Sequence, residues 1–157
     1  MIRHPLGDLE LLLDDTDAWV LDAGGWYAWH SRDTWYAARN YSKPDGSRDV
    51  QYLHRVLMRP AVGQLVDHIN RNGLDNQRAN LRLSTTSQNL ANRPAPRHNR
   101  SGFKGVSWDK RRQKYTAQIT VDGRKRHLGY FTEAQDAASA YNAAALDVWG
   151  DFALLNQ

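Results

Sequence analysis

The sequence predicts an α+β protein in which small antiparallel sheets are combined with a few helices. Three observations support this class. Aromatic and β-branched segments separated by turn signals fill the N-terminal part, a strand–loop–strand–helix pattern lies in the middle, and three strand-like segments precede one long helix near the end. A chain of 157 residues with 41% hydrophobic residues can form one ordinary domain or two small ones.

The N-terminal part is predicted to be an antiparallel β meander. Residues 26–41 are aromatic and β-prone, with a turn signal at residues 31–33, and Pro-Asp-Gly at residues 44–46 marks a second turn. Residues 50–58 are a further strand candidate. Residues 14–21 are expected to form a short helix before the meander.

The middle of the chain is predicted to fold as strand, loop, strand and helix. Residues 65–69 form the first strand, residues 70–79 a polar loop containing an Asn-Gly turn signal, and residues 80–83 the returning strand. A capping-box pattern starts a helix near Thr86, and two prolines beyond residue 93 end it.

Residues 93–101 contain two prolines and three arginines without periodicity, so they are predicted to be an extended basic linker. Residues 102–157 form a separate unit with strands at residues 103–108, 114–121 and 124–131. A tight hairpin signal, Asp-Gly, lies between the last two strands. A second capping box at residues 132–135 opens a helix that extends to about Val148.

The second of these C-terminal strands distinguishes the two faces of its sheet. One alternating set is apolar and should pack on the helix, and the other is polar and should face outward with residues of the third strand. The apolar set is Tyr115, Ala117, Ile119 and Val121, and the outward set is Lys114, Thr116, Gln118 and Thr120 with Lys125 and His127.

The charge distribution favours a polyanionic partner. The net charge is only +4, but residues 93–127 hold 11 Lys and Arg residues and two acidic residues. A solvated basic face is the simpler alternative. The chain has no cysteine, which excludes disulfides and Cys-based zinc sites. It also has no apolar run long enough to span a bilayer and no signal-peptide pattern, so we expect a soluble cytoplasmic protein.

An Asp-His pair in the first middle strand carries the chemical interpretation. Asp67 and His68 are followed by Asn80 after 12 residues and by Asn89 after a further 9. Asp67 and Asn89 offer oxygen ligands of the kind preferred by Mg²⁺ or Mn²⁺, and neutral His68 can take a proton from an attacking water. Asn80 is suited to tying the loop to the hairpin through side-chain to backbone hydrogen bonds. A polar turn without function is the alternative.

These residues resemble the HNH homing endonucleases of phages and mobile introns. The similarity extends over Val66-Asp67-His68-Ile69-Asn70, Asp75-Asn76, Asn80-Leu81-Arg82 and Asn89, with the upstream run Tyr52–Met58. It implies a ββα-metal motif in which Asp67 and Asn89 bind the metal, His68 is the general base and Asn80 is the central Asn. Asn89 stands where many members have His, which favours magnesium. His54 either orients the site, contacts phosphate or is structural, with the structural interpretation favoured, and Arg55 either clamps phosphate or forms a surface ion pair.

The C-terminal unit resembles the APETALA/ethylene-response-factor DNA-binding domain. The similarity lies in Gly102–Trp108, Leu128–Phe131, the Ala-rich segment around Tyr141, and Phe152–Asn156. It implies a three-stranded sheet, backed by the helix, that enters the major groove. The implied DNA contacts are Lys104, Ser107, Arg112, Lys114, Thr120, Lys125 and His127, and the basic linker adds Arg93, Arg97 and Arg100. Ser107, Thr120 and His127 depart from the plant pattern, so the plant target sequence does not transfer.

The sequence therefore predicts an HNH nuclease domain at residues 1–92, a basic linker at 93–101 and a DNA-binding domain at 102–157. The expected protein is a monomeric or dimeric endonuclease that uses Mg²⁺ or Mn²⁺, nicks double-stranded DNA, and is encoded by a phage or mobile element. A non-catalytic DNA-binding regulator is the alternative. An RNA-directed protein ranks last, because the sheet lacks clustered exposed aromatics.

Overall fold

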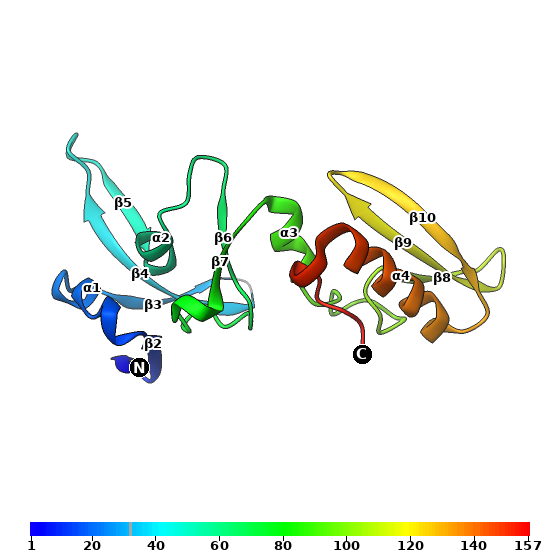
Figure 1. Cartoon of the computed structure of the whole chain (residues 1–157), viewed down its shortest axis with the longest axis horizontal. Helices are drawn as coiled ribbons and strands as arrows, with labels where there is room; N and C mark the ends of the chain where they lie inside the picture. Colours follow the sequence, from blue (N-terminus) through cyan, green and yellow to red (C-terminus); the bar gives the residue numbers. More distant parts are fainter. Residues whose placement is uncertain (32) are drawn as a thin grey trace. The chain divides into compact units, whose positions relative to one another are not determined.

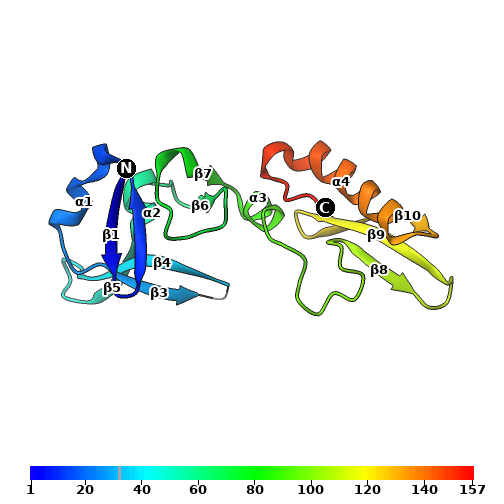
Figure 2. The ribbon, with the colours of Figure 1, turned by 90° about the horizontal axis from the view of Figure 1, so that it is seen from below.

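The computed structural model describes residues 1–31 and 33–157. The chain divides into two compact units, Met1–Thr85 and Thr86–Gln157. Figures 1 and 2 show the first unit in blue to green and the second in green to red. No helix among the described residues is long and apolar enough to cross a membrane.

The first unit consists of small antiparallel sheets and short helices. Its sheets are the hairpins β1–β2 and β6–β7 and the meander β3–β4–β5. Its elements are β1 (Ile2–Leu6), β2 (Leu9–Leu13), η1 (Asp15–Asp17), α1 (Trp19–Asp22), β3 (Tyr27–Ser31), β4 (Thr34–Ser42), β5 (Arg48–Tyr52), α2 (Leu53–Met58), β6 (Leu65–His68), η2 (Arg78–Asn80) and β7 (Leu81–Ser84).

One core joins the pieces of the first unit. Leucines of the β1–β2 hairpin pack with leucines of α2 and with residues of β4, β6, β7 and the loop between β6 and β7. The buried members are Leu6, Leu11, Leu13, Val20, Ala37, Leu53, Leu57, Val66, Leu74 and Leu81. The β1–β2 hairpin had not been predicted, because its leucine-rich sequence gives no clear alternation.

The strand predicted over residues 50–58 is wrong in its second half. The strand ends at Tyr52, and Leu53–Met58 is helix α2. Leu53 and Leu57 are four residues apart and both lie in the core, so burial of one helical face outweighs the β-prone local sequence. Arg59 then ends the helix in the left-handed region, with φ of 45°.

The β1–β2 hairpin also supports the long loop between β6 and β7. The backbone of Leu12 pairs with Asp75: its N–H donates to the carbonyl of Leu74, and its carbonyl accepts from the N–H of Asn76, each at 2.9 Å. Arg78 forms two 2.8 Å hydrogen bonds to the carboxylate of Asp17, which is buried. The loop is therefore fixed by residues about 60 positions earlier in the chain.

The second unit is a three-stranded sheet with one long helix on a single face. The strand order is β10–β9–β8, and the two longer strands lie at the predicted residues. Both hairpin residues, Asp122 and Gly123, have positive φ, as a tight primed turn requires. Its elements are α3 (Thr86–Ala91), β8 (Val106–Asp109), β9 (Lys114–Val121), β10 (Arg124–Phe131), α4 (Ala134–Trp149) and η3 (Gly150–Phe152).

Small residues allow α4 to lie close to this sheet. Ala137, Ala138 and Ala145 are buried against β8 and β9, and the ring of Tyr141 lies over Gly105. A Cβ at Gly105 would overlap the Tyr141 ring, and the φ of 75° also favours glycine there. The predicted capping box is wrong: Glu133 is the N-cap, and its side chain makes no capping hydrogen bond.

The second compact unit begins with helix α3, at Thr86. The predicted nuclease domain, residues 1–92, includes this helix, and that domain boundary stays a prediction. Residues 93–101 also belong to that unit and form hydrogen-bonded turns in place of an extended linker. Asn99 donates to the carbonyl of Phe103 at 2.6 Å, and its own N–H donates to the carbonyl of Pro96.

Candidate functional site

The β6–β7 hairpin positions the Asp-His pair. Asp67 is opposite Arg82 and His68 is opposite Leu81 in the antiparallel register. Both side chains of the pair are nearly buried, with exposed fractions of 4% for Asp67 and 5% for His68. Because successive residues of a strand point to opposite faces, the carboxylate and the imidazole have different surroundings.

His68 lies among other aromatic rings of the first unit. The ring centroid of His54, on α2, is 5.2 Å away in an edge-on arrangement, and that of Tyr36, on β4, is 5.8 Å away. Tyr36 also contacts His54, and Tyr52 stacks on His54 at 5.7 Å. Rings from two other elements of the unit, α2 and β4, therefore contact the imidazole of His68.

These surroundings favour neutral His68. Burial lowers the pKa of the imidazole, and this effect outweighs the hydrogen bond that the imidazole donates to Asn76 and the charges of Asp67 and Asp75, which act to raise the pKa. A neutral imidazole at neutral pH can accept a proton from water. The geometry thus suits His68 to act as a general base.

The second histidine of the cluster has a structural position. Burial, with smaller contributions from His68 and Arg55, lowers the pKa of His54 to about 3. Its Nδ1 atom has no hydrogen-bond partner among the described residues. Its ring contacts Tyr36, Tyr52 and His68, which favours the structural interpretation over phosphate contact. Arg55 is exposed on the same helix.

The unfolding free energy of the protein should decrease in acid because His54 is buried in its neutral form. Its pKa is lower in the folded chain than the unfolded value of 6.5, so its stabilising effect is complete above pH 6.5 and is lost as pH falls toward 3. We expect this group to cost about 2 kcal/mol of unfolding free energy between pH 7 and pH 5, at about 1.4 kcal/mol per pH unit. Urea unfolding of the wild type and of His54→Phe at both pH values measures the difference.

The control for this experiment is Tyr52→Phe, which keeps the ring stacked on His54 and removes only the hydroxyl group. It should keep the pH dependence of the wild type. In His54→Phe, the unfolding free energy should decrease less between pH 7 and pH 5 than it does in the wild type. Equal pH dependence in wild type and His54→Phe would contradict the assignment.

Asp67 forms a buried ion pair with its cross-strand neighbour. Nε of Arg82 donates to Oδ2 of Asp67 at 2.8 Å, and a second guanidinium nitrogen lies 2.7 Å from the same oxygen. The side chain of Arg82 is only 15% exposed. Arg82 therefore orients the carboxylate that the sequence predicts as a metal ligand.

Asn80 connects the two ends of the β6–β7 loop. Its Oδ1 atom accepts from the backbone N–H of Asn70 at 2.9 Å, and its Nδ2 atom donates to the carbonyl of Asp75 at 2.7 Å. Its carbonyl accepts from Ile69, the residue after His68. These bonds confirm the predicted side-chain to backbone connection. They place Asn80 as a support for the loop that follows the base.

A close approach to β4 completes the loop. A Cβ at Gly73 would overlap the carbonyl oxygen of Trp35 and would lie 2.6 Å from the ring of Tyr36. The N–H of Gly73 donates to the hydroxyl of Thr34 at 3.1 Å. Glycine at this position therefore lets the loop pack against Tyr36, the ring that contacts both histidines.

The second unit presents a polar sheet face. The register of β8, β9 and β10 places the predicted contacts Ser107, Lys114, Thr120, Lys125 and His127 on the face opposite α4, and all of them are exposed. Tyr130 shares this face and is 40% exposed. The ring centroid of His127 lies 4.5 Å from that of Tyr130. The guanidinium of Arg112 lies 4.5 Å from the centroid of the same Tyr130 ring, over its face.

Two groups of predicted contacts have other surroundings. Arg93, Arg97 and Arg100 are exposed in the turns before the sheet. Lys104 is turned away from the sheet face, and its ammonium group donates to the backbone carbonyls of Ala91 and Arg93 at 2.5 and 2.7 Å. We therefore remove Lys104 from the proposed set of DNA contacts.

Comparison with known proteins identifies the middle segment. Residues 51–91 match the family model described as HNH endonuclease, and these residues include Asp67, His68, Asn80 and Asn89. This segment of the chain is therefore similar to HNH endonucleases. The match begins in β5, so the helix that holds His54 is part of it.

Two viral proteins are similar to the chain over longer segments. "Protein 3.8" of Escherichia phage T7 is 37% identical over 66 residues, which are 42% of this chain and 54% of that protein. "Uncharacterized HNH endonuclease L560" of Acanthamoeba polyphaga mimivirus is 28% identical over 133 residues, 81% of this chain and 68% of that protein. The chain thus spans about half the length of the phage relative. No solved structure matches.

The donors in the HNH domain suit a hard cation with few protein ligands. No cluster of three or more His, Cys, Asp or Glu side chains able to hold a metal occurs among the residues described. The predicted ligands are instead one carboxylate, Asp67, and one amide, Asn89, which lies on α3 in the second unit. Oxygen ligands in small number fit Mg²⁺, which retains several waters when bound to proteins.

Sequence reasoning missed several neighbours of His68 and Asp67. Tyr36 carries no role predicted from the sequence, and Arg82 is only part of the motif run Asn80-Leu81-Arg82. Arg82 is two residues after Asn80, and pairing of the two strands around that loop would have placed it opposite Asp67. No local signal indicates that Tyr36 reaches His68, because this contact depends on packing between two separate sheets.

Proposed function

We propose that this protein is a metal-dependent DNA endonuclease of the HNH homing type. It hydrolyses phosphodiester bonds, nicks one strand, and selects its sites with the sheet of the second unit. The observation that supports this most directly is the buried His68 beside Asp67 within the matched HNH segment. Both relatives are viral proteins, which supports a phage or viral origin.

The proposed reaction begins with His68. Its neutral imidazole takes a proton from the water that attacks phosphorus, and the 3′ oxygen leaves. Asp67 and Asn89 would hold Mg²⁺ or Mn²⁺, which when bound polarises the phosphate and stabilises charge on the leaving oxygen. Arg82 keeps the Asp67 carboxylate oriented, and Asn80 fixes the backbone next to His68.

Nicking of one strand follows from having one such site in each chain. A double-strand break would need a dimer or two successive cuts. The direct test is conversion of supercoiled plasmid to open circle in Mg²⁺ and in EDTA. Conversion that needs the metal supports the proposal. Tight, salt-sensitive duplex binding without cleavage, on DNA from several candidate hosts, would point to a DNA-binding regulator.

The second unit is proposed to bind duplex DNA with the polar face of its sheet, like the APETALA/ethylene-response-factor domains that it resembles. The charges of Arg112 and Lys114 lie on or beside this face. The contact of Arg112 with Tyr130 and its 3.2 Å ion pair with Asp109 hold the guanidinium group beside the sheet. Arginine can read guanine, whereas lysine mostly contacts phosphate.

Replacement of Arg112 and Lys114 by alanine should weaken duplex binding and its salt dependence. If each side chain neutralises one phosphate, the slope of log K against log[salt] should become smaller by about 1.8. Fluorescence anisotropy on labelled duplex at several salt concentrations measures both quantities. The control is Lys43→Ala in the first unit, where the lysine is paired with Asp49 at 2.8 Å. An unchanged slope in the double variant would exclude this sheet face as the DNA-binding surface.

A further inference from the structure

The second unit begins with a short helix, α3, which contacts several other elements of that unit. Helix α3 contains only six residues, Thr86–Ala91, which is too short to be stable by itself in water. It packs with α4 and η3 of the same unit. Asn89, the proposed metal ligand, lies on this helix, so the contacts of α3 determine where the amide is held.

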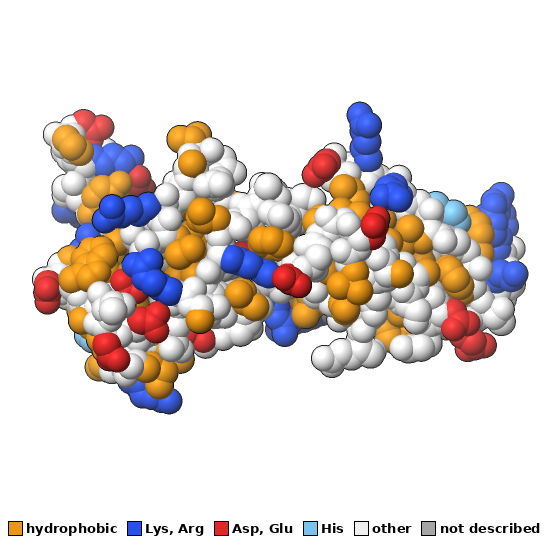
Figure 3. All heavy atoms as spheres, in the orientation of Figure 1, with side chains coloured by type: hydrophobic (Ala, Val, Ile, Leu, Met, Phe, Trp, Pro, Cys, Tyr) orange, Lys and Arg blue, Asp and Glu red, His pale blue; other side chains and the backbone are white. Residues whose placement is uncertain are grey.

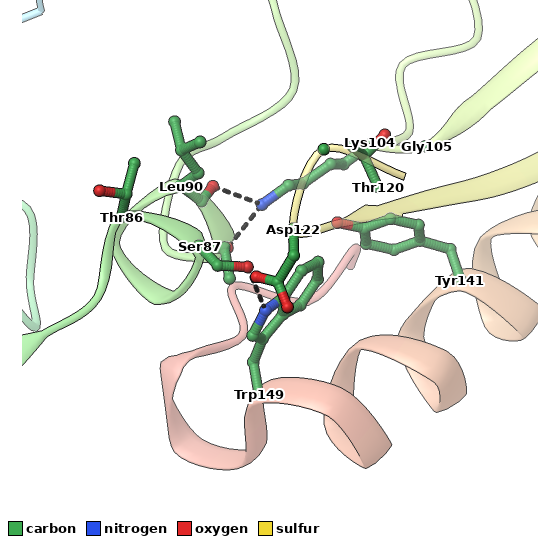
Figure 4. Close-up of a pocket in the computed structure, with 11 residues that line it drawn as sticks. Thr86, Ser87, Leu90, Lys104, Gly105, Thr120, Asp122, Tyr141 and Trp149 are labelled. Atoms are coloured by element: carbon green, nitrogen blue, oxygen red, sulfur yellow. Dashed lines mark hydrogen bonds between the residues drawn. The ribbon is translucent and has the colours of Figure 1, made fainter. Parts of the chain in front are cut away.

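Lys104 attaches to the C-terminal end of α3. Its ammonium group donates to the carbonyl of Ala91 at 2.5 Å and to that of Leu90 at 3.4 Å, as Figure 4 shows. It also donates to the carbonyl of Arg93, just after the helix, at 2.7 Å. The last carbonyls of a helix have no partners within the helix and carry partial negative charge. A cation that bonds several of them therefore both satisfies and stabilises this end of α3.

Two further hydrogen bonds attach the helix to the C-terminal part of the unit. The indole Nε1 of Trp149 donates to the hydroxyl of Ser87 at 3.1 Å, as Figure 4 shows, and the N–H of Leu154 donates to the carbonyl of Ala91 at 3.1 Å. One of these bonds is at the start of α3 and the other is at its end. Asn89 lies between them.

The surroundings of Lys104 fit an internal role. The backbone of Lys104 is itself fixed, because its N–H donates to Oδ1 of Asn156 at 2.6 Å and its carbonyl accepts from Nδ2 of Asn156. Its side chain borders a cavity of about 530 Å³ that is also lined by Leu90, Tyr141 and Trp149. Burial, with a smaller contribution from the charge of Arg93, lowers the pKa of the amine to about 8. A side chain that reaches solvent to contact phosphate would have neither property.

We propose that Lys104 is a positioning residue for metal binding: by fixing the end of α3 to the sheet of the second unit, it sets the position of Asn89. This inference rests on the proposed function. Lys104 therefore acts through Asn89 and does not touch the DNA.

The test compares Lys104→Met with Lys114→Met, which removes a charge from the sheet face. Lys104→Met should keep the wild-type duplex affinity in EDTA. The Mg²⁺ concentration for half-maximal nicking should rise about tenfold, as for losses of groups that orient a ligand. Lys114→Met should show the reverse, with weaker duplex binding and unchanged Mg²⁺ dependence. Lys104→Arg, which retains donors for the carbonyls, should recover part of the Mg²⁺ affinity.

Loss of duplex affinity in Lys104→Met, with unchanged Mg²⁺ dependence, would show that Lys104 contacts DNA and would overturn the proposal. No change in either quantity would overturn it equally. If Lys104→Met does not fold, Trp149→Phe provides the same comparison. It removes the indole N–H that bonds Ser87, keeps an aromatic ring at this position, and should raise the Mg²⁺ requirement by a smaller factor.

A measurement without catalysis separates this inference from the nuclease proposal. Amide hydrogen exchange over residues 86–93, in the absence of metal and DNA, should become about tenfold faster in Lys104→Met, since local opening of α3 becomes easier. If the wild type fails to nick DNA with any metal, the proposed function fails, and the exchange data still decide whether Lys104 fixes α3. Unchanged exchange in Lys104→Met would show that Lys104 does not fix α3, even if the protein is a nuclease.

Discussion

Replacing His68 with alanine should lower the rate of plasmid nicking by about 10³-fold at saturating Mg²⁺, within the range expected for loss of a general base. The neighbouring imidazole of His54 is a poor substitute for the base, because its pKa is lowered to about 3 and its ring is packed among other rings. Duplex affinity in EDTA should be unchanged, since the proposed DNA contacts lie in the second unit. Single-turnover nicking and anisotropy on the same preparations measure both effects.

The pH profile gives a second readout of His68. Because burial lowers its pKa below 6.5, the neutral and active form persists into mildly acidic solution. Wild-type nicking should therefore remain constant from pH 8 down to about pH 6.5 and fall only below it. The control is His4→Ala on β1, which should retain both the rate and the profile. Nicking by His68→Ala at the wild-type rate would remove His68 from the mechanism.

Replacing Asp67 with asparagine should remove both metal-dependent nicking and part of the stability. Arg82 would keep its charge in a nearly buried position without its carboxylate partner, and breaking a buried pair in this way costs about 3–5 kcal/mol. Loss of the only predicted carboxylate ligand should reduce nicking by about 10³-fold, as expected when metal stabilisation of the transition state is lost. Chemical unfolding without metal and nicking with Mg²⁺ measure the two losses separately.

The double variant Asp67→Asn/Arg82→Met distinguishes these two roles. Removing the unpaired guanidinium should recover much of the stability, because an apolar side chain can replace a buried charge at little cost. It should not recover nicking, because the carboxylate is still missing. Arg82→Met alone should keep measurable Mg²⁺-dependent nicking. Recovery of nicking in the double variant would show that Asp67 serves the fold and not the metal.

The sequence predicted the C-terminal sheet better than the N-terminal half, for a physical reason. Strands β9 and β10 alternate cleanly between apolar and polar residues, and Asp122-Gly123 fixes their turn, so local information is sufficient. In contrast, Leu9–Leu13 and Leu53–Met58 have apolar runs that fit either a strand or a helix. Their structure is decided by the shared core of the first unit, which no local pattern records.

The candidate site shows the same division. Asp67, His68 and Asn80 could be predicted as site residues from residue type and spacing, because the loop motif is local. The ring contacts of Tyr36 with both histidines depend on how two sheets pack, and they could not be predicted. Lys104 shows the limit of transferring roles by resemblance, because its position fits the family pattern while its ammonium group is directed to α3.

The hydrogen bonds between Leu12 and the β6–β7 loop, with the Arg78–Asp17 pair, have a practical meaning for anyone who wishes to graft the proposed nuclease onto another protein. A fragment cut to residues 51–91 would contain the whole family signature. It would also leave behind the hairpin that buries the back of the loop, and Arg78 would lose its carboxylate. We therefore expect functional chimeras to retain the first fifty residues.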